Sequence, residues 1–402
     1  MKKPRLNGFA TSEQAVLVLG TRSNLSTDES LRLRQLVNEE LDWRAMLESA
    51  NCHQVLALLL TNLTRENCLP SMPRRVCQSL RAAVHERAAR SLALTQELVR
   101  ILDLLERSDV PAIPCKGPVV ALMAYGSVSL RSFADLDILV PETHLHLARE
   151  ALQSMGYRSV VSLNTKQERA FLQNECALQL KDEARGLVVE LHWRFCERNA
   201  SIDLPVADFW RRSVRVSLAG TEVLTLAGED LLLYLCVHGA KHRWERLEWI
   251  TCVAALVRWN QFDWGSVILR AEGFAIARIV RVGLMLAQVV GGAQIPSSVC
   301  TWVDSDGTAQ KLTERILADL FSPVADQSHY HRRASRYLFM MRCRERWSDR
   351  ARIFFYSAIR PPHPDADEWA YLPGKLAFLH RVFRPVRLFA EYSWVAWRHY
   401  LR

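Results

Sequence analysis

The sequence has no long uncharged apolar run, and this absence excludes an ordinary membrane-spanning helix. The best candidate, residues 274–290, is interrupted by Arg278 and Arg281, whereas a spanning helix needs about 20 mostly apolar residues. The basic N-terminus (Lys2, Lys3 and Arg5) is not followed by the apolar segment of a secretory signal peptide. We therefore expect a cytoplasmic protein with no transmembrane segment.

The ten cysteines include no Cys-x-x-Cys pair, so the usual spacing of zinc ribbons and thioredoxin-like sites is missing. Several cysteines lie within apolar runs, where a free thiol behaves as a small hydrophobic group. This distribution indicates a reducing compartment rather than a disulfide framework. The chain also lacks internal repeats and low-complexity tracts, which excludes repeat architectures.

The charge is concentrated at one end of the chain. The 402 residues carry a formal net charge of +9, and the segment after Tyr330 has 15 lysines and arginines against 6 acidic residues. A basic tail of this kind can bind nucleic acid, anionic lipid or a phosphorylated substrate. Its arginines alternate with aromatic residues, which also fits helix packing with arginine side chains that reach solvent. We favour packing and keep nucleic-acid binding as the alternative.

Hydrophobic periodicity divides the chain into regions of different secondary structure. Strand and helix patterns alternate in the middle, with strands near 110–115, 133–140, 157–163, 177–181 and 187–193 and helices at 118–125 and 142–155. The pattern predicts an α+β fold, in which a small mixed sheet lies within a mainly helical protein. The expected regions are a flexible, irregular N-terminus (1–26), a helical N-terminal region (27–108), the mixed core (109–205), a helical domain (206–325) and a basic C-terminal region (326–402) with helices near 331–358 and 369–400.

Two aspartates open the second strand of the core. In a strand, alternate residues face the same side, so Asp135 and Asp137 present two carboxylates together while Leu136 and Ile138 face the opposite way. Two carboxylates this close repel unless one is protonated or a cation lies between them. Paired carboxylates suit Mg²⁺, which prefers oxygen ligands and is often completed by substrate phosphates. We predict a metal site here, against the alternative of two solvated acids.

This stretch, together with later motifs, resembles a known family. A strand, Lys116-Gly117, a short helix, Arg131 and an Asp-x-Asp strand are similar to the nucleotidyltransferase core shared with DNA polymerase β. More closely, the chain resembles the bacterial family of uncharacterised nucleotidyltransferases over most of its length. The matching segments are Lys116-Gly117, Tyr125, Arg131, Asp135–Val140, Val189–Trp193, Asp42-Trp43, His238–Trp249, Arg384-Pro385 and Arg387-Leu388.

The resemblance implies a role for each carboxylate. Asp135, Asp137 and Glu190 would hold two Mg²⁺ ions, with Mn²⁺ as an alternative, and Glu190 would help remove a proton from the acceptor. Two metal ions can stabilise both the attacking and the leaving oxygen of an in-line displacement. His192 lies on the same strand face as Glu190, so we expect it either in the nucleotide site or as a hydrogen-bonded residue of its wall.

The cations near the carboxylates are expected to bind the nucleotide. Gly117 allows the backbone to approach phosphate closely, and Lys116 and Arg131 would hold the triphosphate, unless they are ordinary surface charges. Gly126-Ser127 resembles the Gly-Ser signature of the superfamily, but it follows the helix. We interpret it as a turn and assign the phosphate loop to Lys116-Gly117.

A histidine-rich segment follows in the helical domain. His238 and His242 share a helix face, but no glutamate lies between them and no third ligand is evident, so zinc binding is not favoured. The resemblance favours a helix that faces the active cleft, with Lys241 and His242 in the nucleotide site. One departure is Cys252, which stands where the family usually has Asp.

We therefore expect a nucleotidyltransferase that moves a nucleoside monophosphate from an NTP, ATP first, to an acceptor and releases pyrophosphate. Four classes of acceptor stay open: a small molecule, a peptide, a saccharide or RNA. The alternatives are a nucleotide-binding regulatory or toxin–antitoxin-type protein without turnover, and a phosphotransferase on the same core.

Overall fold

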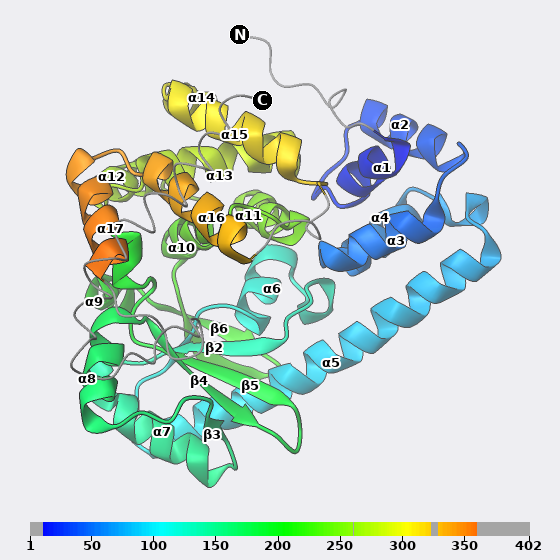
Figure 1. Ribbon diagram of the computed structural model, residues 1–402. Coiled ribbons are helices and arrows are strands. Elements are labelled where there is room, and N and C mark those ends of the chain that lie inside the picture. The colour runs from blue at the N-terminus through cyan, green and yellow to red at the C-terminus, as the bar shows by residue number, and fades with distance from the viewer. Residues whose placement is uncertain (1–10, 260, 323–328, 360–402) are drawn as a thin grey trace.

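The computed structural model describes residues 11–259, 261–322 and 329–359. These residues form one small mixed β-sheet covered by many helices (Figure 1). The expected α+β class, with a small sheet inside a mainly helical protein, is confirmed.

The central sheet has five strands in the order β1-β2-β5-β4-β3. β2 and β5 are parallel neighbours, and every other pair in this sheet is antiparallel. The strands expected near 177–181 and 187–193 are present and pair as a hairpin, whereas the strands expected at 110–115 and 157–163 are reduced to two residues each. The bounds are β1 Ile113–Pro114, β2 Asp135–Leu139, β3 Arg158–Ser159, β4 Ala177–Asp182 and β5 Leu187–His192.

The two faces of this sheet have different chemistry because side chains alternate along each strand. One face packs against α5 (Arg74–Arg107) and α7 (Leu145–Ser154) and is mainly apolar. Its core joins Leu136 and Ile138 of β2 to Leu191 of β5. The opposite face carries the acidic residues of both strands and lies below α10 (Gly228–Lys241) and α11 (Leu247–Trp259) in Figure 1.

Four helices precede α5 and pack together at one end of the molecule (Figure 1). The expectation of an irregular segment over residues 1–26 is wrong for residues 12–20, which form α1. Thr11 caps this helix, and its residues 16–20 are buried. The capping residue followed by an apolar run was the local signal. The bounds are α1 Ser12–Gly20, α2 Thr27–Val37, α3 Trp43–Cys52 and α4 Leu56–Arg65, with a 3-10 turn at Leu69–Ser71.

A second helical layer covers the acidic side of the sheet (Figure 1). The region expected to be a helical domain (206–325) also contains a separate two-stranded hairpin, which follows a short helix. Short 3-10 turns occur at Val128–Leu130, Glu142–His144 and Arg198–Ala200. The remaining bounds are α6 Pro118–Tyr125, α8 Thr165–Asn174, α9 Val206–Arg211, β6 Val214–Leu218, β7 Thr221–Thr225, α10 Gly228–Lys241, α11 Leu247–Trp259, α12 Trp264–Gly273, α13 Ala277–Val289, α14 Ser297–Asp304 and α15 Gly307–Asp319.

The C-terminal region begins with two helices rather than the single one expected at 331–358. α16 (His329–Cys343) and α17 (Trp347–Ile359) are separated at Arg344, whose guanidinium is buried and bonded to Asp349 at 2.8 Å. The helix expected at 369–400 lies outside the described residues. Within the described part of the chain, no helix combines the length and the apolar composition needed to cross a bilayer.

Candidate functional site

The two aspartates of β2 face the cleft above the sheet, as the alternation predicts. Asp137 is 3% exposed, and Asp135, at the start of the strand, is partly exposed. Burial, followed by the charge of Asp137, raises the pKa of the Asp135 carboxyl. The neighbouring side chains Leu136 and Ile138 point into the apolar core on the other face.

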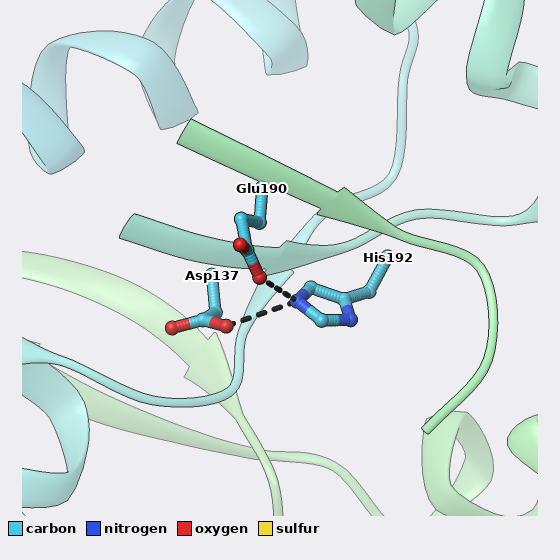
Figure 2. A group of neighbouring side chains, drawn as sticks. All are labelled: Asp137, Glu190 and His192. Atoms are coloured by element: carbon cyan, nitrogen blue, oxygen red, sulfur yellow. Dashed lines mark hydrogen bonds and ion pairs between the residues drawn. The ribbon is translucent and has the colours of Figure 1, made fainter. Parts of the chain in front are cut away.

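The third carboxylate comes from the parallel neighbour of β2. Glu190 is the register partner of Asp137 in β5, so the expected position of Glu190 on an adjacent strand is confirmed. His192, two residues further on, lies between the two acids (Figure 2). Its Nε2 atom is 2.9 Å from Oδ1 of Asp137 and 3.3 Å from Oε2 of Glu190. His192 is therefore the residue that bridges the two strands on this face.

Lys116 completes the charge balance of this cluster. Its ammonium group forms an ion pair with Oδ1 of Asp137. Burial alone would raise the pKa of Asp137, but Lys116 and His192 together hold it well below its usual range. Burial would likewise lower the pKa of Lys116 and of His192, and their acidic partners raise both instead. The Asp137 carboxylate is thus ionised, and Lys116 and His192 are both cationic when no metal ion is bound.

The donor set fits a divalent metal ion. Ligand atoms of Asp137, Glu190 and His192 all lie within 4.8 Å of one another. Carboxylate oxygens suit Mg²⁺ and Mn²⁺, and an imidazole nitrogen is an additional donor to transition metals. Among the described residues, this is the one group of three such side chains close enough to hold an ion. The His238–His242 pair, whose ring centroids are 4.8 Å apart, belongs to no such group within the same residues.

The predicted phosphate loop is the turn that leads into α6. Gly117 precedes the first residue of that helix and has φ +58° and ψ −125°, a conformation that favours glycine. Gly126, at the other end of α6, is left-handed with φ +70° and closes the helix. The interpretation of Gly126-Ser127 as a turn is therefore confirmed.

Arg131 is buried in an ion pair rather than free in the cleft. Its Nε atom bonds to Oε1 of Glu248 in α11, and its Nη1 donates to the carbonyl of Gly117 at 3.5 Å. Burial would lower the pKa of Arg131, but Glu248 raises it. This arginine links the phosphate-loop turn to α11 and also lines the cleft, and its expected contact with phosphate stays a prediction.

Cys252 belongs to the same buried network. Its thiol is 3.4 Å from Oε1 of Glu248 and 3.4 Å from the hydroxyl of Tyr125 in α6. Burial raises the pKa of this thiol to about 12, so it is neutral. In this chain the acidic partner of Arg131 is Glu248, one helical turn before Cys252.

The helices above the sheet supply the rest of the cleft. Lys241 reaches Glu197 at 3.0 Å, and burial lowers the pKa of His242 to about 4. Both residues line the cleft, as expected, together with His238 and Trp249. The cleft has a volume of about 510 Å³, which is within the usual range for small-molecule sites.

The structure therefore brings together all the predicted site residues around this cleft: Asp135, Asp137, Glu190, Lys116, Arg131, His192, Lys241 and His242 line it directly, and Gly117 forms the adjoining turn. Sequence reasoning missed Gln54, which the N-terminal helical region contributes. It follows His53, whose carbonyl and ring accept hydrogen bonds from the backbone of Glu248 and Leu247. No local motif marks Gln54, because its position depends on docking between distant helices.

The arginines of the tail that the structure describes are largely engaged in packing. Arg336 bonds to Glu245 at 3.2 Å, and Arg350 donates to the carbonyl of Arg344 at 2.9 Å. The first contact joins α16 to the segment between α10 and α11, and the second joins α17 to the segment between α16 and α17. The basic segment after residue 359 lies outside the described residues.

The sequence matches a family described as uncharacterised nucleotidyltransferase over residues 39–292. One similar solved structure is an antibiotic-resistance factor, ANT(2'')-Ia, with 12% identity, 48% of this chain and 90% of that chain covered, and a TM-score of 0.28. Another is an antigenic nucleotidyltransferase-like protein from Paracoccidioides brasiliensis, with 14% identity, coverage of 54% and 96%, and a TM-score of 0.28. A search of curated proteins finds no match.

Proposed function

Because the chain belongs to the uncharacterised nucleotidyltransferase family, we propose that it transfers a nucleoside monophosphate from an NTP to an acceptor in a reaction that depends on Mg²⁺. The family match extends over more than half of the chain and includes the sheet, the acidic cluster and the helical wall of the cleft. The enzyme is accordingly a nucleotidyltransferase, and ATP is the donor to be examined first.

One observation carries the proposal. Asp137 and Glu190 are register partners on parallel strands, and their side chains share the cleft with Asp135. Three carboxylates on one face would repel one another without cations. Asp135, Asp137 and Glu190 would hold the metal ions, which supply charge neutralisation for the phosphates and for the attacking and leaving oxygens.

The protein's own residues then bind and orient the reactants. Lys116 lies at the carboxylate cluster and Lys241 on the helical wall, so the triphosphate would lie between two ammonium groups. Arg131 acts as a positioning residue, because it ties the Gly117 turn to α11. Its buried ion pair fixes the two walls of the cleft relative to each other.

The chemical step follows from this placement. An acceptor oxygen attacks the α-phosphorus and forms a new P–O bond, while the bond between the α-phosphorus and the bridging oxygen breaks. Pyrophosphate leaves with that electron pair. The carboxylate of Glu190, which is partly exposed in the cleft, accepts the proton of the acceptor.

A labelling experiment tests this function. The protein is incubated with each of the four NTPs, labelled at the α- or the γ-phosphate, with MgCl₂ and an extract that contains small molecules and RNA. Transfer of the α-label supports the proposal. Transfer of the γ-label would identify a phosphotransferase, and binding without consumption would identify a regulatory protein.

The extract includes RNA because nucleic-acid binding by the basic tail stays a prediction. The extract is prepared under reducing conditions, because all ten cysteines are free thiols and we expect a cytoplasmic protein.

A further inference from the structure

The helical wall of the cleft presents flat, uncharged rings. The ring centroids of His242 and Trp249 are 5.1 Å apart, and those of His238 and Trp249 are 5.6 Å apart. Burial lowers the pKa of both histidines, that of His242 to about 4, so both are neutral at pH 7. The guanidinium of Arg246 lies 5.3 Å from the centroid of Trp249, a geometry that restrains the indole ring. Such a surface suits a flat molecule better than a phosphate group.

This ring wall, made of His238, His242 and Trp249, lies within reach of the acidic cluster. Lys116 and the three rings line the same cleft, and the ammonium group of Lys116 contacts Asp137. A single molecule with an anionic end and a flat end therefore fits the cleft, with its anionic end at Lys116 and its flat end against the rings. Nucleoside triphosphates have this construction.

Gln54 adds an unused amide to this part of the cleft. It is a non-glycine residue with φ +58°, a conformation that costs a side chain of this type of the order of 1 kcal/mol or more. Its side chain makes no hydrogen bond to any other residue that the structure describes, and it lines the cleft. A strained backbone that presents a free donor and acceptor at a binding site indicates a role in recognition.

We propose that the ring wall is the nucleobase subsite, in which the base stacks on Trp249 and His242 and the amide of Gln54 hydrogen-bonds to the edge of the base. The inference rests on the proposed function, because the ligand is the NTP of that reaction. Stacking provides affinity for any base, since every base has a flat face. The amide of Gln54 provides the preference among bases.

Binding measurements on the full chain test the stacking. The affinities of the four NTPs and of inorganic tripolyphosphate, which has no base, are measured by calorimetry with MgCl₂. We expect Trp249→Ala to weaken NTP binding by about 5- to 150-fold, the loss typical of one base–aromatic stack, and to leave tripolyphosphate binding unchanged. Trp249→Phe, the matched variant, keeps a stacking ring and should retain most of the affinity. If Trp249→Ala lost the same affinity for the NTPs and for tripolyphosphate, or lost no affinity for the NTPs, the proposed subsite would be wrong.

Gln54→Gly tests the recognition of the base. Glycine relieves the positive φ, so the thermal unfolding midpoint should stay the same or rise, while the spread of affinities among the four NTPs should narrow. Gln54→Asn keeps an amide and tolerates a left-handed backbone, and it should preserve part of the preference. An unchanged ranking and spread in Gln54→Gly would contradict the assignment.

The two proposals fail in different ways. Absence of binding by every NTP to the wild-type protein would overturn both the proposed function and the subsite. NTP binding that Trp249→Ala leaves unchanged would overturn the subsite alone, and the ring wall would then belong to the acceptor.

Discussion

The ammonium group of Lys116 contacts Oδ1 of Asp137, the same oxygen that lies 2.9 Å from Nε2 of His192. This carboxylate is 3% exposed, so its charge is balanced by the protein rather than by water. A metal ion at the acidic cluster would take over part of that balance.

Asp137→Asn should abolish stabilisation by metal ions. In the wild-type protein, MgCl₂ or MnCl₂ should raise the thermal unfolding midpoint, since an ion that binds only the folded state at 100 times its Kd adds about 2.7 kcal/mol. The amide lacks the negative charge, so the shift should disappear. The control is Glu183→Gln, a substitution of an acid on the β4–β5 turn that is 76% exposed, and this variant should keep the full shift. A shift that persists in Asp137→Asn would show that the ion binds elsewhere.

Lys116→Met should destabilise the protein without added metal more than with it. Removing one partner of a buried ion pair costs about 3–5 kcal/mol, and a bound cation should recover part of this loss by compensating Asp137. Urea unfolding with and without MgCl₂ measures how much unfolding free energy Lys116→Met loses in each condition. Lys181→Met removes an ion pair to Glu183 that is partly exposed, and it should cost at most about 1 kcal/mol. An equal loss for Lys116→Met in both conditions would contradict a shared role of lysine and metal.

An acid at position 252, one helical turn after Glu248, should be able to replace Glu248 as the partner of Arg131. Glu248→Gln leaves Arg131 buried without its partner, with an expected loss of about 3–5 kcal/mol, and Cys252→Asp adds a second buried carboxylate. The double variant restores one acid for one guanidinium, because residues 248 and 252 share a face of α11. Its stability should exceed that of either single variant. If the losses of unfolding free energy from Glu248→Gln and Cys252→Asp simply added in the double variant, the acid at position 252 would not replace Glu248.

His53 should make the protein less stable at acidic pH. Burial, with a further contribution from Arg246, lowers the pKa of His53 from 6.5 to about 4 in the folded state. Between these values the unfolded state binds a proton that the folded state does not, so stability is complete above pH 6.5 and falls as the pH approaches 4. His53→Asn keeps an acceptor for the backbone N–H of Leu247 and should reduce this fall by the order of 2 kcal/mol. The free energy of unfolding is measured by chemical denaturation at pH 7 and pH 4.5 for the wild type and for His53→Asn. An equal loss of stability between the two pH values in both proteins would contradict this prediction.

The local part of this architecture follows from the sequence. The alternation at Asp135 and Asp137 set the orientation of both carboxylates, and hydrophobic periodicity near 177–181 and 187–193 located β4 and β5. The family resemblance added Glu190, which period-two alternation then placed on the same face as His192. These features depend on neighbours within a few residues.

The rest depends on contacts between distant segments. Arg131 looked available for phosphate, but its partner Glu248 lies 117 residues away, and no local pattern specifies that pair. Gln54 enters the cleft because His53 docks on the start of α11. The hairpin of β6 and β7 lies within the region expected to be a helical domain, although Val214, Val216 and Leu218 alternate with polar residues as in a half-exposed strand.

Pyrophosphate release is the most direct test of the carboxylate cluster as the centre of nucleotidyl transfer. Release from each NTP is measured with MgCl₂ and a cell extract as the source of acceptors, for the wild-type protein, Asp137→Asn and Glu183→Gln. We predict release by the wild type and Glu183→Gln, and a loss on the order of 100-fold or more in Asp137→Asn, comparable to removing a group that stabilises transition-state charge. Equal rates of pyrophosphate release from Asp137→Asn and the wild type would contradict the account.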